Sequence, residues 1–334
     1  MPEDERQKLA SFVTPLPAHV WVATSGTTGA LKLTALSKQA ILASAAAVNR
    51  RLQSNASDVW CCVLPTFHVG GLGIYARAHL SGARVIASQW NPQQFAAMRE
   101  ITLASLVPAQ VRDLVAAQLR PPAQLRSILV GGGAFDVDLC HAARELGWPV
   151  LPSYGMTELC STIAVANGDG GALFLLDHVE ARTEEDGRLA FRSAALLTGY
   201  GSEAGFTDPK ADGWLMTEDL GNIDGRQLSV TGRKGDFIKI GGESVDLSRL
   251  DAILASIAGL HAAVVAMPDE RLGQVVHLAI DRSMDARAVA SAYNSRVHPF
   301  ERARRIHVVD EIPRSSLGKL LRKQLLDRLP KIVE

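Results

Sequence analysis

A stretch rich in hydroxyl groups and glycine occupies residues 24–32, with the sequence Thr-Ser-Gly-Thr-Thr-Gly-Ala-Leu-Lys. Val20 and Val22 alternate just before it, which predicts a short strand that leads into a loop. The glycines let the backbone turn so that successive N–H groups can face an anion, while the hydroxyls add donors and Lys32 adds positive charge. This composition suits a polyphosphate, and a solvated turn rich in Ser, Thr and Gly is the alternative.

The spacing in this loop differs from that of P-loop kinases and ATPases. Their pattern has glycine directly before the lysine and Ser or Thr directly after it. Here Leu31 and Leu33 flank Lys32, which excludes a P-loop kinase.

The composition limits how many domains the chain can form and which kinds of binding partner it can have. The chain has 334 residues, 47% of them hydrophobic, which is enough for two domains. Its 35 basic residues balance 35 acidic ones, so no general attraction to nucleic acid or an anionic membrane is indicated. Neither a signal peptide nor an apolar run of about 20 residues is present, so no membrane insertion is expected. No CxxC pair occurs among Cys61, Cys62, Cys140 and Cys160, which predicts buried free thiols in a reducing cytoplasm.

Alternating apolar segments predict a largely parallel α/β sheet in the first half of the chain. Strands are expected at 58–64, 84–87, 103–107, 127–130 and from 150, and helices at 37–52, 93–99, 109–119 and 136–146. Ligands gather beyond the carboxyl ends of such strands. Thr24, His68, Gly131 and Tyr154 each come just after a predicted strand, so we expect them at one edge of the sheet.

The character of the chain changes from about residue 173, where turns and short strands dominate. Hairpin signals at 185–187 and 224–225 predict a small β-rich subdomain. After residues 233–236 we expect a compact unit with helices at 248–257 and 285–296, strands at 262–267, 275–280 and 306–309, and a basic final helix. We therefore predict an N-terminal domain at 1–234 and a C-terminal domain at 235–334.

Five segments in this order resemble motifs of the adenylate-forming acyl-CoA synthetases. Residues 24–32 resemble the phosphate loop, 154–158 (Tyr-Gly-Met-Thr-Glu) the adenine and magnesium segment, and Asp219 the ribose-binding aspartate. Residues 232–243 resemble the hinge and the following loop, and 313–319 (Pro-Arg-Ser-Ser-Leu-Gly-Lys) the catalytic-lysine motif. The resemblance covers essentially the whole chain. It implies a large N-terminal α/β domain with a β-rich subdomain, plus a small mobile C-terminal α+β lid.

The resemblance implies that ATP and Mg²⁺ bind in the N-terminal domain. Glu158 would hold Mg²⁺, which prefers carboxylate oxygen, Tyr154 would stack on adenine, and Asp219 would accept both ribose hydroxyls. Taken alone, these residues would be a surface glutamate, a core aromatic and a turn aspartate. The predicted nucleotide-binding residues are Thr24, Ser25, Gly26, Thr27, Thr28, Gly29, Lys32, Gly131, Gly132, Tyr154, Gly155, Thr157, Asp219, Arg233 and Gly242.

Lys319 is the predicted catalytic residue of the first step, and Glu158 assists through Mg²⁺. A carboxylate that attacks the α-phosphate of ATP builds negative charge, which a positioned ammonium stabilises. A solvated lysine in a basic run is the alternative. In the implied mechanism an acyl-adenylate and pyrophosphate form, the small domain rotates, and coenzyme A displaces AMP. Gly235 stands where the family often has Asp or Lys, so rotation is easier and each state less fixed.

Within the superfamily, residues 64–73, 106–110, 129–135 and 153–161 are most similar to the o-succinylbenzoate–CoA ligases of menaquinone biosynthesis. The implied substrate is a dicarboxylate whose aryl carboxylate stays anionic, and a buried anion needs a donor or cation. Arg77 is the predicted partner, with Gln110 and Ser153 as weaker candidates. His68 is predicted to steer the reacting carboxylate or gate the acyl channel, and a buried structural histidine is the alternative.

Other reactions share the same nucleotide motifs. Another aryl or acyl acid CoA ligase would differ only in the acyl pocket, and an adenylation enzyme would load a carrier protein. A non-catalytic nucleotide-binding module is a third alternative, which the presence of Lys319 and Glu158 disfavours. Most family members have a long segment before the phosphate loop, where this chain has residues 1–23. We expect a minimal ligase, or a homodimer that covers the exposed surface, rather than an inactive product.

Overall fold

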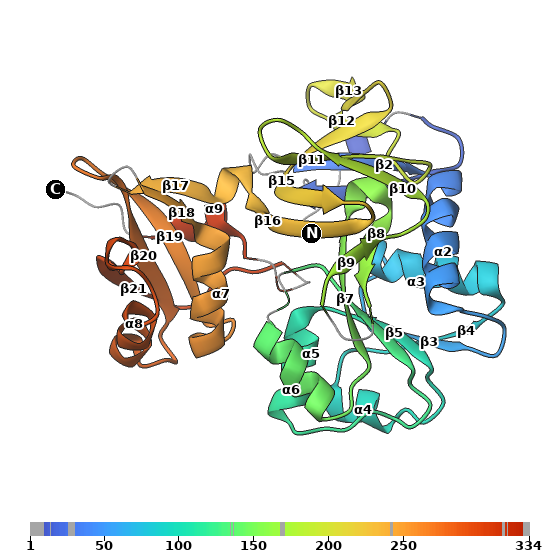
Figure 1. The fold of residues 1–334 in the computed structure, drawn as a ribbon, viewed down its shortest axis with the longest axis horizontal. Coiled ribbons are helices and arrows are strands. Elements are labelled where there is room, and N and C mark those ends of the chain that lie inside the picture. Colours follow the sequence, from blue (N-terminus) through green and yellow to red (C-terminus); the bar gives the residue numbers. More distant parts are fainter. Residues whose placement is uncertain are drawn as a thin grey trace. The chain divides into compact units, whose positions relative to one another are not determined.

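The computed structural model describes residues 10–13, 15–25, 31–133, 135, 137–167, 171–240, 243–315, 318 and 320–329. Two compact units are present (Figure 1). Residues 1–217 and 221–230 form unit 1, and residues 218–220 and 231–334 form unit 2. The predicted division into an N-terminal domain at 1–234 and a mobile C-terminal domain at 235–334 stays a prediction.

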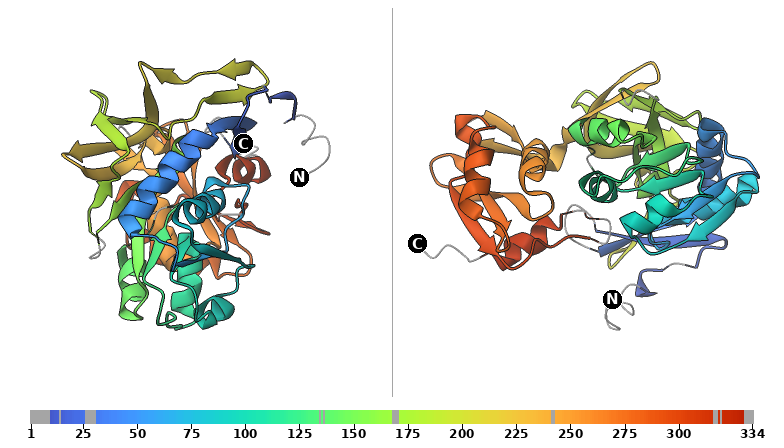
Figure 2. Two further views of the ribbon diagram at one scale, coloured as in Figure 1. Left: turned by 90° about the vertical axis from the view of Figure 1, so that its right-hand side faces the viewer. Right: turned by 90° about the horizontal axis from the view of Figure 1, so that it is seen from below.

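Unit 1 contains the predicted parallel sheet, with helices on both faces. Its strands run parallel in the order β4 (Arg84–Ala87), β3 (Val59–Cys62), β5 (Leu103–Leu106), β6 (Ser127–Val130) and the start of β7 (Val150–Met156). Cys61 faces α4 (Pro92–Ala97), α5 (Pro108–Ala116) and α6 (Val137–Glu145). Trp60 and Cys62 face α2 (Lys38–Leu52) and α3 (Val69–Ser81), which pack side by side (Figure 2). All four residues of β3 and of β5 are buried, as expected for strands covered on both faces.

The local signals for these elements are confirmed. Helix α2 begins after Ser37, whose hydroxyl accepts the N–H of Ala40, and it ends at Gln53 in a left-handed conformation. The predicted helix at 93–99 begins one residue earlier, because Asn91 caps α4 and Pro92 is its first residue, and it ends earlier as well, at Ala97.

Strand β7 is where the sheet changes direction. It pairs in parallel with β6 through Pro152 and antiparallel with β8 (Ser161–Ala166) from Ser153 onward. The reversal requires glycine at 155, since a Cβ there would lie 1.7 Å from the carbonyl oxygen of Ser161. The 3-10 turn η1 (Thr157–Leu159) connects the two strands.

Beyond β8 the sheet is antiparallel, as the sequence predicts for a β-rich part. Its further strands are β9 (Leu173–Leu175), β16 (Gln227–Arg233), β15 (Trp214–Asp224), β11 (Arg188–Ser193) and β10 (Val179–Thr183), with β14 (Lys210–Ala211) beside β15. Among the described residues this makes one sheet of 12 strands. The predicted turns at 185–187 and 224–225 are confirmed, because they connect β10 to β11 and β15 to β16.

A separate four-stranded antiparallel sheet holds both ends of the predicted phosphate loop. Its order is β1 (His19–Ser25), β2 (Leu31–Ser37), β12 (Gly199–Ser202) and β13 (Gly205–Thr207). The prediction that Thr24 follows a strand of the parallel sheet is wrong, because Thr24 lies within β1 and pairs with Lys32 of β2. Residues 33–36 are all buried, so β2 lacks the alternation that marks a half-exposed strand.

Unit 2 is an α+β unit with the predicted elements. Its sheet runs β18 (Glu243–Asp246), β17 (Phe237–Ile240), β20 (Gly273–Asp281), β19 (Ala262–Asp269), and β21 (Arg305–Val309) is parallel to β20. Helices α7 (Leu247–Ala258) and α8 (Ala286–Asn294) cover one face, and α9 (Arg322–Arg328) packs on Ala263 and Val265 of the other. Gly235 lies in the short turn η2 (Lys234–Asp236), and a Cβ there would meet no atom within 4 Å.

Candidate active site

The ends of the predicted phosphate loop are placed, and its centre lies outside the described residues. The predicted residues that fall outside them are Gly26, Thr27, Thr28, Gly29, Gly242 and Lys319. The backbone of Thr24 and Ser25 belongs to β1. Lys32 follows at the start of β2, with its ammonium nitrogen 3.6 Å from the ring centroid of Tyr200. This distance places the cation on the aromatic face.

Glu158 is held next to the same tyrosine. It is the middle residue of η1, directly after β7, and Thr157 begins that turn. The hydroxyl of Tyr200 donates to Oε1 of Glu158 over 2.8 Å, and the N–H of Leu197 donates to its backbone carbonyl over 2.8 Å. Two predicted site residues, Lys32 and Glu158, therefore meet at one side chain that the sequence analysis did not identify.

The sequence carries a signal for Tyr200 in its two flanking glycines. A Cβ at Gly199 would lie 2.4 Å from the ring of Phe206, and one at Gly201 would lie 2.3 Å from the carbonyl oxygen of Phe12. A Gly-Tyr-Gly sequence on a strand indicates close backbone approach around one retained aromatic side chain.

Glu158 fits the ligand that Mg²⁺ prefers. The carboxylate supplies a hard oxygen, and within the described residues the only side chain bonded to it is Tyr200, through Oε1. No cluster of three or more His, Cys, Asp or Glu side chains is found in the part of the chain that the structure describes. A single carboxylate suits magnesium that is bound mainly through nucleotide phosphates and water.

Three other predicted nucleotide-binding residues lie on β7, β15 and β16. Tyr154 packs against Phe191, with ring centroids 6.0 Å apart. Asp219 on β15 and Arg233 on β16 form an ion pair, Oδ1 to Nε, at 3.4 Å. Both belong to unit 2, so a carboxylate and a guanidinium that could face ribose hydroxyls are paired before any nucleotide binds.

Gly131 and Gly132 follow β6, beside Ser153 of β7. A Cβ at Gly131 would lie 2.9 Å from the Ser153 hydroxyl oxygen, and Gly132 has a φ of +81°. Ser153 donates its hydroxyl to the carbonyl of Val130 over 2.9 Å. Glycine is therefore needed here for close packing of the two strand ends.

Arg77 on α3 is a buried cation without a carboxylate partner among the described residues. Its guanidinium donates to the hydroxyls of Ser105 (3.1 Å), Thr162 (3.2 Å) and Ser161 (3.4 Å). Nε is buried without any acceptor within that part of the chain. Burial lowers the pKa of Arg77 to about 10, so it is still charged at pH 7. An uncompensated cation of this kind is suited to an anion.

His68 and Gln110 lie near the starts of two helices. His68 precedes α3, and its ring lies 4.7 Å from that of Phe67. Burial lowers its pKa, which favours the neutral imidazole. The side-chain oxygen of Gln110 accepts the N–H of Val107 over 3.0 Å at the start of α5. Of the described residues, neither Gln110 nor Ser153 bonds to Arg77.

A family model described as "AMP-binding enzyme" matches residues 16–200, which contain every predicted site residue of unit 1. The chain belongs to the AMP-binding enzyme family. It is 30% identical to a 2-succinylbenzoate–CoA ligase of Bacillus licheniformis, over 90% of this chain and 68% of that enzyme. It is 31% identical to one of Geobacillus kaustophilus, over 92% and 69%.

Solved structures of o-succinylbenzoate CoA synthetase share the fold of this AMP-binding enzyme. The Bacillus subtilis enzyme in complex with the acyl-adenylate intermediate OSB-AMP has a TM-score of 0.82 at 28% identity, over 91% of this chain and 68% of that one. The same enzyme with ATP and magnesium ion has a TM-score of 0.81 at 28% identity, over 92% and 69%. The predicted fold class, an acyl-CoA synthetase-like α/β protein, is confirmed by this likeness.

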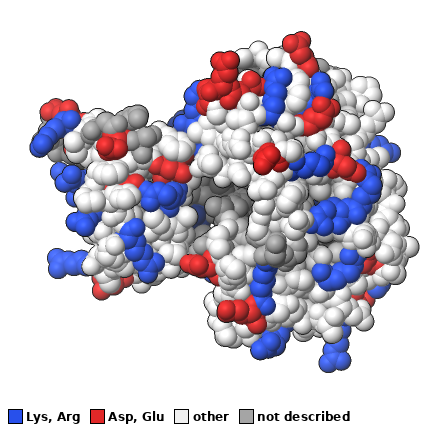
Figure 3. Space-filling model, in the orientation of Figure 1, with Lys and Arg blue, Asp and Glu red and all other residues white. Residues whose placement is uncertain are grey.

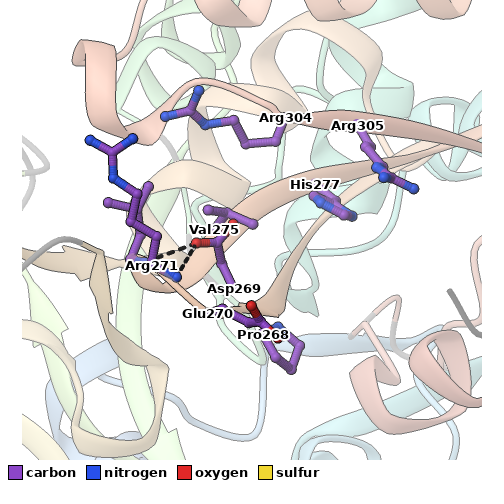
Figure 4. Close-up of a pocket in the computed structure, with 9 residues that line it drawn as sticks. Pro268, Asp269, Glu270, Arg271, Val275, His277, Arg304 and Arg305 are labelled. Carbon is purple, nitrogen blue, oxygen red and sulfur yellow. Dashed lines mark hydrogen bonds between the residues drawn. The ribbon is translucent and has the colours of Figure 1, made fainter. Parts of the chain in front are cut away.

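A basic pocket lies in unit 2 of this AMP-binding enzyme, at the turn between β19 and β20 (Figure 4). It has a volume of about 420 Å³, and its charged lining consists of Arg271, Arg304 and Arg305 together with Asp269 and Glu270. The nearby carboxylate of Asp269 accepts the backbone N–H groups of Arg271 (3.0 Å) and Leu272. The pocket leaves no local signal in the sequence, because Arg271 lies in the turn between β19 and β20 whereas Arg304 and Arg305 come much later, at the start of β21.

His277 also lines the pocket and is neutral at pH 7. Burial and the neighbouring His307 and Arg305 lower its pKa to about 4, and its Nδ1 lies 2.9 Å from Nε2 of His307. The guanidinium groups therefore supply the positive charge of this pocket. On the face of the molecule in Figure 3, by contrast, charged side chains of both signs are interspersed.

Proposed function

We propose that this chain is an ATP-dependent ligase that joins o-succinylbenzoate to coenzyme A through an acyl-adenylate, a step of menaquinone biosynthesis. The similarity to 2-succinylbenzoate–CoA ligases over about nine-tenths of the chain supports the reaction class. The observation that carries the choice of a dicarboxylate is Arg77, a buried guanidinium without a carboxylate partner among the described residues. The activated succinyl carboxylate must reach ATP, while the aryl carboxylate keeps its charge and needs such a cation.

In the first step a carboxylate oxygen attacks the α-phosphorus of ATP, and the bond to the departing pyrophosphate breaks. Glu158 would hold Mg²⁺, which neutralises charge on the phosphates. Lys32 would contact the phosphates, Asp219 the ribose, and Lys319 the charge that develops at the α-phosphate. In the second step the sulfur of coenzyme A attacks the acyl carbon and AMP leaves.

Coenzyme A would place its 3′-phosphate in the basic pocket of unit 2. Three arginines in one pocket suit phosphate, because a guanidinium can donate two parallel hydrogen bonds to its oxygens. The backbone N–H of Arg304 is bonded to Val276 over 2.8 Å, which fixes the start of this arginine's side chain. The neutral His277 adds no further charge to the lining, which also contains Asp269 and Glu270.

Arg304→Ala is expected to raise the KM for coenzyme A about tenfold, the ratio that corresponds to about 1.4 kcal/mol. Adenylate formation should be unchanged, because that step does not use coenzyme A. The matched control is Arg287→Ala, an exposed arginine on α8 outside the pocket. Dephospho-coenzyme A, which lacks the 3′-phosphate, should show a smaller difference between variant and parent. An equal rise for both thiols, or a fall in adenylation, would refute this assignment of the 3′-phosphate.

An ATP–pyrophosphate exchange screen across carboxylic acids tests the substrate. We expect the highest kcat/KM with o-succinylbenzoate and formation of its coenzyme A thioester by mass spectrometry. Faster exchange with a monocarboxylic aryl or acyl acid would assign the chain to another acid–CoA ligase. Exchange without any thioester would favour loading of a carrier protein, and nucleotide binding without exchange would indicate a non-catalytic module.

The cytoplasm is the proposed location of the reaction. No helix in the described part of the chain is both long and apolar enough to cross a membrane. All four cysteines are buried as free thiols, and burial raises the pKa of Cys61 and of Cys160 to about 12. Protonated thiols of this kind suit a reducing compartment. Association into a homodimer stays a prediction that sedimentation analysis would test.

A further inference from the structure

One tyrosine, Tyr200, connects two elements to which the proposed function assigns phosphate and metal binding. Its ring lies beneath the ammonium of Lys32 and its hydroxyl bonds to Glu158. The three residues lie on β12, β2 and η1, which are well separated in sequence. Tyr200 itself belongs to no predicted binding or catalytic set.

The register of the four-stranded sheet explains the contact with Lys32. Tyr200 pairs with Thr34 of β2, and paired residues of antiparallel strands place their side chains on one face. Lys32 lies two residues before Thr34, so it is on that same face and diagonal to Tyr200. The ammonium therefore reaches the ring at 3.6 Å as a consequence of strand pairing.

The backbone before Tyr200 fixes Glu158 as well. The N–H of Leu197 donates to the Glu158 carbonyl, and the N–H of Thr198 donates to Ala35 of β2, both over 2.8 Å. On the opposite face of β12, Gly199 and Gly201 are packed so closely that a Cβ would collide. The strand is consequently held on both faces, and the tyrosine ring has a defined position.

We propose that Tyr200 is a positioning residue that presents Glu158 to Mg²⁺ and Lys32 to the phosphates of ATP. This inference rests on the proposed function. A tyrosine hydroxyl has a single hydrogen, and here it is donated to Oε1, which leaves Oε2 of Glu158 for the metal. Magnesium tolerates little deviation from octahedral geometry, so a carboxylate held in one orientation binds it better. The aromatic face holds the lysine without neutralising its charge.

Two variants separate the two contacts. Tyr200→Phe keeps the ring below Lys32 and removes only the hydrogen bond to Glu158, whereas Tyr200→Leu removes both. Binding of Mn²⁺ to the complex of protein and a non-hydrolysable ATP analogue, followed by electron paramagnetic resonance, reports on the metal without any acid substrate. We expect Tyr200→Phe to weaken Mn²⁺ binding about tenfold, the lower end of the effect of outer-sphere ligand partners. Metal-free affinity for the analogue should stay the same in Tyr200→Phe and fall in Tyr200→Leu.

The enzymatic measurement for Tyr200→Phe is the dependence of ATP–pyrophosphate exchange on the Mg²⁺ concentration. Its half-saturating Mg²⁺ concentration should rise, and excess Mg²⁺ should restore kcat, which a loss of folding would not allow. The matched control is Tyr75→Phe, the removal of a hydroxyl from an exposed tyrosine on α3. Unchanged Mn²⁺ affinity in Tyr200→Phe, or equal losses with and without metal, would overturn the proposal. If no carboxylic acid supports ATP–pyrophosphate exchange by the parent protein, the proposed function fails. The Mn²⁺ titration still decides the role of Tyr200 in that case.

Discussion

Replacement of Lys319 by alanine is expected to slow acyl-adenylate formation roughly 10²–10³-fold, the effect of removing one donor that stabilises transition-state charge. Thioester formation from a supplied acyl-adenylate should be retained, because phosphorus is not attacked in that step. ATP–pyrophosphate exchange measures the first half-reaction, and release of AMP from synthetic acyl-adenylate with coenzyme A measures the second.

The residues on either side of Lys319 support this prediction. Arg314 donates to the carbonyl of Gly318 (3.1 Å) and also to those of Leu260 and Ala262, which precede or begin β19. Arg314 further forms an isolated bridge with Leu320. Gly318 and Leu320, the described residues on either side of Lys319, are thus linked to the core of unit 2 through an arginine of the same motif.

Lys323→Ala is the matched control, since it removes an exposed lysine four residues further along the same basic segment. Its two half-reactions should match those of the parent protein. Equal losses in both half-reactions of Lys319→Ala would contradict the assignment of this lysine to adenylation alone. The same loss in Lys323→Ala would indicate that adenylate formation depends on the total charge of the segment and not on Lys319 specifically.

Local patterns in the sequence were sufficient for elements whose signals lie within a few residues. Ser37 predicted the start of α2, and the glycines after 185 and 224 predicted two hairpins, because caps and turns depend on adjacent residues. Strand β2 was missed, since its four central residues are buried and carry no alternation. Its partner β12 is more than 150 residues away in sequence, and such a pairing leaves no local trace.

The residues of the candidate site also divide into those that local motifs predict and those that only the pairing of distant strands brings together. Glu158 and Lys32 were found by their motifs, but the side chain that joins them, Tyr200, is visible only once the strands are paired. Gln110 was predicted to contact substrate because of its place in a motif. The structure shows its side-chain oxygen bonded to the start of its own helix, a role that a Pro-Ala-Gln sequence after a strand could have indicated.

Arg77→Met is expected to lower kcat/KM for o-succinylbenzoate about 30- to 5,000-fold, because loss of one partner of a buried charge pair costs roughly 2–5 kcal/mol. The variant keeps an unbranched apolar side chain of similar length in the space beside Gly73, where a Cβ would already lie 3.3 Å from the guanidinium. Thermal unfolding measures the net effect on stability, since the variant removes a buried charge but also the donor to the hydroxyls of Ser105, Thr162 and Ser161. Lowering of the Arg77 pKa to about 10 corresponds to roughly 3 kcal/mol against the buried charge, which an apolar side chain does not pay.

A substrate without the aryl carboxylate separates recognition from packing. With 3-benzoylpropionate, Arg77→Met and the parent protein should differ by no more than about threefold, so the variant and the missing carboxylate are strongly coupled in a double-mutant cycle. Arg77→Lys, which keeps the charge and loses the paired donors, should fall between the two for the diacid. Arg50→Met, at an exposed arginine paired with Asp177, is the matched control and should leave both substrates unaffected. Equal losses with diacid and monoacid would mean that Arg77 shapes the acyl pocket without contacting the second carboxylate.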